Sequence, residues 1–338
     1  MWSMLESGFP AVEDAPRPVT LGVEIRRLTG LFRVAGIASA ALDARLLAAE
    51  ACGLAAEDAI LRRDMALDSS EVARIAAFAA RRLAGEPVSR IMGRREFWGL
   101  SFDISPATLD PRPESELLVQ TVLDYVKSEG LRSEPMRILD LGTGTGCLLC
   151  ALLSELPLSQ GVGLDRSEDA LAVAQDNLSR LGLRERASLL CGNWLSSIGG
   201  APFDVIVCNP PYIETGGIGG LDLAVRGYDP VLALDGGEDG LKAYRHILPQ
   251  AQAVLRPGGL LIFEVGYTQG RAALDLMQQT APDAGFTNVG ILTDLAGAER
   301  AVAGVRQSER ETPNCKKRIG NSALSRYGRS DRRFAVDP

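Results

Sequence analysis

The stretch "ILDLGTGTGCLL", residues 138–149, decides the fold of this chain. An apolar segment typical of a strand runs into Gly142, Gly144 and Gly146, and an apolar segment typical of a helix follows. Glycines let a backbone pass close to a ligand, and the N-terminus of the helix behind them offers free N–H groups. The next strand-like segment, "GVGLD", ends in Asp165, which can accept hydrogen bonds from both hydroxyls of a ribose. These features predict a nucleoside-type cofactor.

Strand-like and helix-like segments alternate on both sides of this turn. After a helix expected near residues 114–128 come "MRILDL", a helix from Gly146, "GVGLD", a helix through Asn177, "ASLLC", "FDVIVC", a helix near residues 241–255 and "GLLIFEVG". Alternation of this kind predicts an α/β fold with a largely parallel, doubly wound sheet. The last two candidates, "FTNVGILTD" and "RAVAGV", would add an antiparallel pair at the edge.

The chain before this region is rich in alanine and leucine with helical period. Ser69 or Ser70 could cap a helix at its N-terminus, and Gly53 and Gly85 could end two helices. We therefore expect a small all-helical domain, which either serves packing alone or forms a platform for a macromolecular partner.

The composition along the chain predicts five parts. These are an N-terminal tail, a helical domain, a β-hairpin linker, an α/β domain and a basic tail that we expect to be disordered, at residues 1–19, 20–85, 86–112, 113–306 and 307–338.

The composition limits the location and the partners of the protein. Among 338 residues, Lys and Arg total 36 against 43 Asp and Glu, so no global positive field attracts nucleic acid or anionic lipid. The six cysteines lack the spacing of a disulfide scaffold, and Cys147 and Cys150 are expected to be buried thiols with no metal. The acidic first residues do not resemble a signal peptide, and no apolar run approaches the roughly 20 residues that span a bilayer. We expect a cytoplasmic protein with no membrane partner.

Two cofactors, a dinucleotide and S-adenosyl-L-methionine (AdoMet), could use such a turn. Asp140 ends the strand before the glycines, where a carboxylate would repel a pyrophosphate but tolerate the amino group of a methionyl moiety. This favours AdoMet, although Asp140 could instead be a strand-end carboxylate satisfied by nearby backbone. In "CGNWL", Asn193 could bind an adenine edge while Trp194 lies against the ring, unless Trp194 is an ordinary core residue.

A stiff polar corner follows the strand-like segment "FDVIVC". In Asn209-Pro210-Pro211-Tyr212, the prolines hold the backbone extended and could present the Asn209 side-chain oxygen and the Pro210 carbonyl as fixed acceptors beside the Tyr212 ring. Two such acceptors fit a planar NH2 group and would turn its nitrogen toward a methyl donor. We therefore expect Asn209, Pro210 and Tyr212 to be catalytic without a general base, and His246, the only histidine, to be a structural or surface residue.

Over about residues 21–306, the sequence resembles the peptide chain release factor N5-glutamine methyltransferases, the PrmC/HemK family. The resemblance rests on "GRREFWGLSF", "PRPESELLV", "DLGTGTGCL", "CNPPYI", "YDPVLALDGGEDGL", "FEVGYTQG" and "DLAGAER", in that order. It implies a class I Rossmann-like methyltransferase domain with a seven-stranded, mainly parallel sheet, preceded by a helical domain that docks the release factor. It also implies methylation of the glutamine in the Gly-Gly-Gln motif of class 1 release factors.

The resemblance also implies roles for single residues. AdoMet would contact Gly142, Thr143, Gly144, Thr145, Gly146, Asp165, Trp194 and Asn209, and the glutamine amide would contact Asn209, Pro210, Pro211 and Tyr212. The segment "RPESE", residues 112–116, matches the family without a defined role. Two positions depart from the family pattern. Asn193 replaces a common aspartate but keeps a carbonyl acceptor, so we expect cofactor binding to survive, and Asp110 replaces a usual apolar residue and could disturb the hinge locally.

Three other functions compete with this interpretation. An N6-adenine or other exocyclic-amine methyltransferase of DNA or RNA could use the same corner, but the acidic composition argues against it. A non-catalytic module that binds release factor or ribosome could keep the fold without turnover. A nicotinamide oxidoreductase would leave the corner at residues 209–212 without a role.

Overall fold

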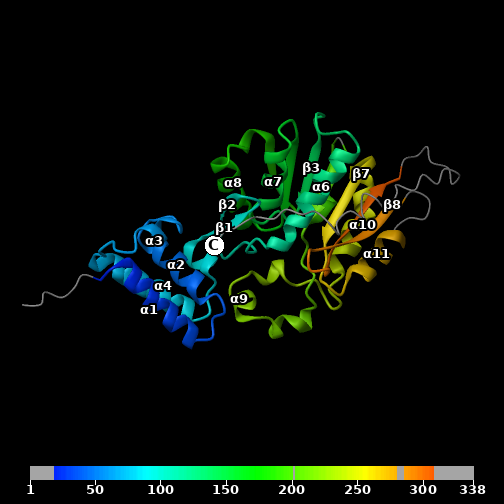
Figure 1. Ribbon diagram of the computed structural model, residues 1–338. Coiled ribbons are helices and arrows are strands. Elements are labelled where there is room, and N and C mark those ends of the chain that lie inside the picture. The colour runs from blue at the N-terminus through cyan, green and yellow to red at the C-terminus, as the bar shows by residue number, and fades with distance from the viewer. Residues whose placement is uncertain (1–18, 201, 280–284, 308–338) are drawn as a thin grey trace, which may run out of the picture. The chain divides into compact units, whose positions relative to one another are not determined.

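The computed structural model describes residues 19–200, 202–279 and 285–307, and both predicted tails lie almost entirely outside this part of the chain. The chain divides into two compact units between Met92 and Gly93 (Figure 1). We describe each unit by itself.

The first unit is helical, as the sequence predicts. Its helices are α1 (Leu21–Val34), α2 (Ala40–Ala51), α3 (Asp58–Leu61), α4 (Ser69–Leu83) and α5 (Val88–Met92). Leu28, Phe32, Leu47 and Ile75 are fully buried and form the centre of its hydrophobic core.

The helix ends of this unit test the predicted caps. Gly53 and Gly85 follow α2 and α4 with φ angles of 65° and 96°, which confirms both as helix ends. The prediction of Ser69 or Ser70 as an N-cap is wrong, because Asp68 caps α4. The Asp68 carboxylate accepts a hydrogen bond from the Glu71 N–H, and the Glu71 carboxylate accepts one from the Asp68 N–H, both at 2.8 Å.

The structure divides the predicted linker, residues 86–112, between the two units. Its first part forms α5, because Pro87 fixes the backbone ahead of the helix and Gly93, with a φ angle of 71°, ends it. The expected hairpin follows in the second unit, where β1 (Arg94–Phe97) pairs antiparallel with β2 (Leu100–Asp103).

The second unit contains a seven-stranded mixed sheet. Its strands are β3 (Arg137–Leu141), β4 (Gln160–Asp165), β5 (Ala187–Cys191), β6 (Phe203–Cys208), β7 (Leu255–Glu264), β8 (Phe286–Thr293) and β9 (Glu299–Arg306). They lie in the order β5-β4-β3-β6-β7-β9-β8. The first five are parallel, and β9 is antiparallel to β7 and β8. This confirms the mainly parallel sheet and the antiparallel edge pair.

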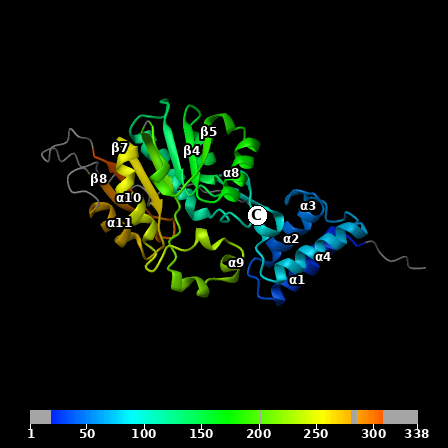
Figure 2. The same cartoon turned by 180° about the vertical axis from the view of Figure 1, so that it is seen from behind.

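Helices cover both faces of the sheet (Figures 1 and 2). One face packs against α6 (Glu116–Ser128), α7 (Cys147–Glu155) and α8 (Glu168–Arg180), and the other packs against α10 (Lys242–Val254) and α11 (Gly270–Gln279). Alternate residues serve the two layers: Ile138 of β3 belongs to the first core and Leu139 to the second. Burial on both faces explains why the central strands β3 and β6 and the second half of β7 are almost continuously apolar.

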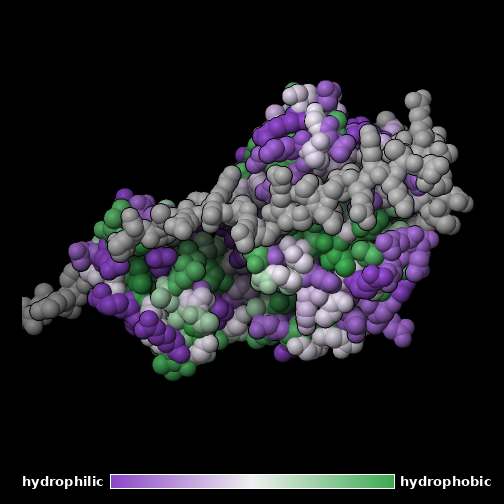
Figure 3. All heavy atoms as spheres, turned by 45° about the vertical axis from the view of Figure 1, so that its right-hand side comes forward, coloured by the Kyte–Doolittle hydropathy of each residue, from purple (hydrophilic) through white to green (hydrophobic). Residues whose placement is uncertain are grey.

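The remaining helical segments are short. They are α9 (Leu223–Arg226) and 3-10 turns at Pro113–Ser115, Arg184–Arg186, Trp194–Ser197, Thr215–Gly220 and Val231–Ala233. None of the helices in the described ranges is long and apolar enough to cross a membrane. Hydrophilic and hydrophobic residues are mixed over the face seen in Figure 3.

Candidate active site

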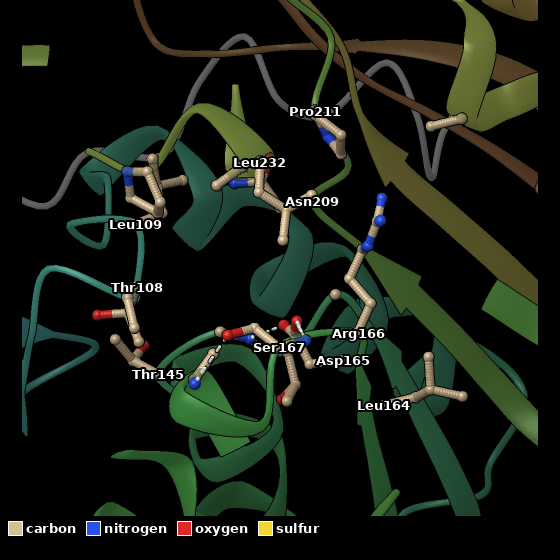
Figure 4. Close-up of a pocket in the computed structure, with 18 of the residues that line it drawn as sticks. Thr108, Leu109, Thr145, Leu164, Asp165, Arg166, Ser167, Asn209, Pro211 and Leu232 are labelled. Carbon is tan, nitrogen blue, oxygen red and sulfur yellow. Dashed lines mark hydrogen bonds between the residues drawn. The ribbon is translucent and has the colours of Figure 1, made fainter. Parts of the chain in front are cut away.

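A cavity of about 470 Å³ opens at the carboxyl ends of β3, β4, β5 and β6. Residues 142–145, 165–167, 192–194 and 209 form the strand-end wall, and residues 107–109, 111, 112 and 230–233 form the second wall. In Figure 4, Asn209 and Leu232 lie across the cavity from Asp165 and Ser167. A cavity of this size and place suits a nucleoside-sized ligand in a doubly wound fold.

The glycine turn forms a cradle at the base of the cavity. Gly142 and Gly144 line it with φ angles of 71° and 54°, and a Cβ on either would meet no protein atom closer than 3.9 Å. The space beside their backbone is therefore open to a ligand. Gly146 also has a positive φ but does not line the cavity: a Cβ there would lie 3.4 Å from the Ala174 Cβ, so Gly146 allows α7 to start close to α8.

Asp165 is held in a defined orientation at the end of β4. Its Oδ2 accepts a hydrogen bond from the Gly144 N–H at 2.9 Å, and its Oδ1 accepts one from the Ser167 N–H at 3.0 Å (Figure 4). Each carboxylate oxygen keeps a second acceptor position. Asp165 lines the cavity and can thus accept hydrogen bonds from a diol there.

Asp140 has a different place from the one expected. It is fully buried, does not line the cavity, and accepts a 2.6 Å hydrogen bond from the Thr143 hydroxyl. Burial raises the pKa of its carboxyl group to about 7. Asp140 therefore braces the glycine turn from below instead of lining the cavity. That its charge favours AdoMet over a dinucleotide stays a prediction.

Trp194 and Asn193 line the cavity after β5, as predicted. Trp194 is half-buried, packs against the core under α10 and has a φ of 52°, in the left-handed region that non-glycine residues rarely adopt. A strained backbone at a ligand cavity favours a role in binding over a role in the core alone.

The proline corner after β6 is only partly exposed to the cavity. Asn209 and Pro211 line it, whereas Pro210 is buried and Tyr212 turns away. Two glycines pack against Tyr212: a Cβ on Gly236 would lie 2.7 Å from the Tyr212 Cα, and one on Gly240 would lie 2.3 Å from the Tyr212 carbonyl oxygen. The corner is therefore rigid through packing as well as through its prolines.

Sequence reasoning missed Ser115 and Glu264, which the fold brings to Asn209. The Asn209 amide nitrogen donates to the Ser115 Oγ at 3.0 Å, and the Ser115 hydroxyl donates to Glu264 Oε2. The Tyr212 hydroxyl donates to Glu264 Oε1 at 3.2 Å. Burial raises the pKa of Glu264 to about 7. An acid at the end of the apolar strand segment "LLIFE" was the available signal.

The second wall is fastened by charged groups. The Asp229 carboxylate is buried, pairs with Arg112 of the wall and accepts a hydrogen bond from the Asp110 N–H at 3.2 Å. The Asp110 side chain, one of the two departures from the family pattern, lies 3.7 Å from Arg95 Nε. The positive charge of Arg95 explains how the fold tolerates a buried carboxylate at Asp110.

Two other singled-out residues, Cys147 and His246, also line the cavity. His246 is an exposed residue of α10 at the cavity rim, consistent with the predicted surface histidine. Cys147 and Cys150 are free thiols: Cys150 is buried, as expected, and Cys147 is half-buried.

Comparison with known proteins identifies the family. The PrmC N-terminal domain family matches residues 25–93, and a methyltransferase domain family matches residues 132–306. The release factor glutamine methyltransferase of Bradyrhizobium diazoefficiens is 43% identical over 300 residues, which cover 87% of this chain and 97% of the relative. The chain belongs to the release factor glutamine methyltransferase family.

Other comparisons agree with this assignment. The release factor glutamine methyltransferase of Vibrio cholerae is 38% identical and matches over 87% of this chain and 99% of its own length. The catalytic domain of hMettl16, solved in complex with MAT2A 3'UTR hairpin 6, shares the fold with a TM-score of 0.51 at 17% identity, covering 72% of this chain and 84% of that one. The chain is therefore an AdoMet-dependent methyltransferase with a Rossmann-like domain.

Proposed function

We propose that this enzyme transfers the methyl group of AdoMet to the side-chain amide nitrogen of the glutamine in the Gly-Gly-Gln motif of class 1 release factors. The observation that carries the proposal is the position of Asn209. Its side chain lies at the cavity, across from Asp165, with its amide nitrogen already bonded to Ser115. The Asn209 oxygen is left as an acceptor for a substrate amide.

The strand-end wall fits AdoMet. Gly142, Thr143, Gly144 and Thr145 would lie along the methionyl part, Asp165 would accept the ribose hydroxyls, and Trp194 would contact the adenine. Gly146 supports this wall from behind. What AdoMet supplies is an electrophilic methyl group: a N–C bond forms while the S–C bond breaks, sulfur keeps the bonding electrons, and the amide nitrogen releases a proton to water.

The corner at residues 209–212 contributes to catalysis by orienting the substrate amide. An amide nitrogen is a weak nucleophile because its lone pair is delocalised, so it must be aimed at the methyl carbon. We assign the Asn209 oxygen to one amide hydrogen of glutamine, and Pro211 to the wall beside it. The Pro210 carbonyl, proposed for the second hydrogen, belongs to a residue that is buried and does not line the cavity. Tyr212 would fix the corner through its bond to Glu264. Catalysis would then come mainly from orientation.

The helical unit is the proposed docking domain for the body of the release factor. Large apolar side chains are exposed around the turn between α1 and α2: Val34 is 92% exposed, Leu42 47% and Leu31 41%. Exposed apolar groups of this kind are typical of protein contact sites. We propose that the chain has three functional parts, namely the helical docking domain, the β-hairpin and the methyltransferase domain.

Labelled methyl transfer from AdoMet tests the substrate. The enzyme would be offered a class 1 release factor, the same factor with its loop glutamine changed to alanine, DNA and ribosomal RNA, followed by mass mapping. We expect label on the loop glutamine and none on the alanine variant. Label on nucleic acid alone would contradict the substrate, and no label despite AdoMet binding would favour a non-catalytic module.

The Asn209→Ala variant tests the proposed amide clamp. We expect turnover with release factor to fall by on the order of 100-fold or more, because the substrate nitrogen loses its orienting acceptor. AdoMet affinity, measured by calorimetry, should change little. Near-normal turnover in this variant would contradict the clamp.

A further inference from the structure

The hydrogen bonds that link Asn209 to Ser115 and Ser115 to Glu264 all donate in the same direction, toward Glu264. We propose that Ser115 and Glu264 are positioning residues that fix the Asn209 side-chain amide with its oxygen toward the substrate. This inference rests on the proposed function, because it assigns residues that orient the same reacting amide.

The hydrogen-bond inventory sets this direction. An ionised carboxylate only accepts, so both hydroxyls that contact Glu264, those of Ser115 and Tyr212, must donate to it. A serine hydroxyl has one hydrogen, so once Ser115 has donated it can only accept from its other neighbour. That neighbour is Asn209, which must then offer its NH2 end. The Asn209 oxygen consequently points away from Ser115.

Burial makes the direction costly to reverse. Ser115 is 2% exposed and Glu264 3% exposed, so water does not readily replace a lost partner. If the Asn209 amide flipped, its oxygen would face the Ser115 lone pairs and the serine would have no hydrogen left to offer. A buried polar group that has lost its hydrogen-bond partner destabilises the flipped arrangement.

Three separate segments meet in this chain of bonds. Ser115 closes the 3-10 turn before α6, Glu264 ends β7, and Asn209 follows β6. The Glu264 carboxylate also holds Tyr212, so one buried acid fixes both ends of the corner. Ser115 itself lines the cavity, whereas Glu264 does not and can act only through Ser115 and Tyr212.

The charge of Glu264 controls the direction. The ionisable groups that act on it are Tyr212 of the corner, Tyr244 of α10, Cys208 of β6, Glu114 before α6 and Arg300 of β9. Glu114 disfavours the charge and Arg300 favours it, but burial is the largest influence and raises the pKa to about 7. Only the ionised form requires Ser115 to donate, so turnover should rise with pH through this range.

The test compares Ser115→Ala, Ser115→Thr and Glu264→Gln with the wild-type enzyme, using release factor and labelled AdoMet from pH 6 to 9. Tyr244→Phe is the matched control, because the Tyr244 hydroxyl bonds the backbone oxygen of Glu264 and not its carboxylate. We expect kcat to fall on the order of 10- to 100-fold in Ser115→Ala, with little change in KM for release factor or in AdoMet affinity. Ser115→Thr, which keeps the hydroxyl, should recover most of the loss.

The pH profile separates positioning from simple destabilisation. The rise of kcat near pH 7 should disappear in Glu264→Gln and remain in Tyr244→Phe. Wild-type kcat in Ser115→Ala, or an unchanged rise in Glu264→Gln, would overturn the inference while the substrate assignment stands. If Ser115→Ala no longer binds AdoMet, Glu264→Gln alone decides. Absence of label on the release factor with the wild-type enzyme would instead remove the proposed function itself.

Discussion

At the scale of single residues, Asp165 connects the glycine turn to the proposed ribose site. Removing its carboxylate in Asp165→Ala would free the Gly144 and Ser167 N–H groups and delete the acceptor for the ribose. A hydrogen bond to a charged group contributes about 1.5 to 3 kcal/mol, so the Kd for AdoMet should rise at least about 10-fold. Calorimetric titration measures this.

The matched variant is Asp165→Asn, which keeps one oxygen acceptor and should lose less affinity. Equal AdoMet affinity in the wild type and Asp165→Ala would show that the ribose lies elsewhere.

Only part of the site could be predicted from single residues. Asn209 and Asp165 stand in short motifs, each at the end of a strand, and such motifs place a side chain at the carboxyl edge of the sheet. Ser115 is separated from Asn209 by 94 residues, and Glu264 from Ser115 by 149, so no local pattern links them. The depth of Asp140 under the turn was equally hidden, because sequence does not show which way a strand-end side chain points.

At the scale of elements, the corner depends on a close backbone contact with the loop before α10. In Gly240→Ala, the added Cβ would lie 2.3 Å from the Tyr212 carbonyl oxygen and 2.2 Å from Gln269 Nε2, the group that donates to that oxygen. We expect the corner to shift and turnover to fall on the order of 10- to 100-fold, because methyl transfer is sensitive to displacements of about 1 Å.

Gly258→Ala is the control for backbone strain. Gly258 has a φ of 77°, close to the 71° of Gly240, but a Cβ there would meet nothing within 4 Å. Both variants should lose stability in a thermal melt, and only Gly240→Ala should lose turnover beyond that. Equal turnover in the two variants would show that the contact with Tyr212 does not matter.

Elements with strong periodicity were predicted well and short ones were not. The strands from β3 to β7 and the edge pair appear where the apolar segments stand, because burial on both faces leaves a clear signal. The ten-residue helix α11 and the five-residue helix α5 were missed. Their few apolar positions can be recognised as a buried face only when the surface that they pack against is known. The cap at Asp68 was displaced by one residue, within the usual uncertainty of helix ends.

At the scale of the whole molecule, the proposed docking role can be separated from chemistry. We expect the double variant Leu31→Ser, Val34→Ser to raise KM for intact release factor and to leave KM for a short Gly-Gly-Gln peptide unchanged. The side chains are 41% and 92% exposed, so folding should be little affected. Leu295→Ser, at an exposed side chain of the second unit, is the control. Equal KM values for all three proteins would contradict docking at this turn.

The stability of the second unit should fall as pH rises through neutrality. Burial raises the pKa of Asp140 from 3.8, and that of Glu264 from 4.5, to about 7. The folded state therefore holds protons that the unfolded chain has lost, so this contribution is complete below about pH 4 and is lost as pH approaches and passes 7.

Urea unfolding followed by the fluorescence of Trp98 and Trp194 measures this effect. Between pH 5 and pH 8, Asp140→Asn should lose about 2 to 4 kcal/mol less than the wild type, since its amide carries no proton to release. Parallel losses in both proteins would show that Asp140 is charged throughout this range.

The strand order has a consequence for synthesis on the ribosome. Among the described residues, β9 is the last strand in sequence order. It lies between β7 and β8, and its Ala301 pairs with Glu264. A nascent chain that has emerged only to residue 298 thus has β7 and β8 without the strand that joins them, and Glu264 without its backbone neighbour. The corner therefore cannot form completely during synthesis until β9 has emerged from the ribosome. A chain truncated before β9 should be inactive although it keeps the glycine turn and the proline corner.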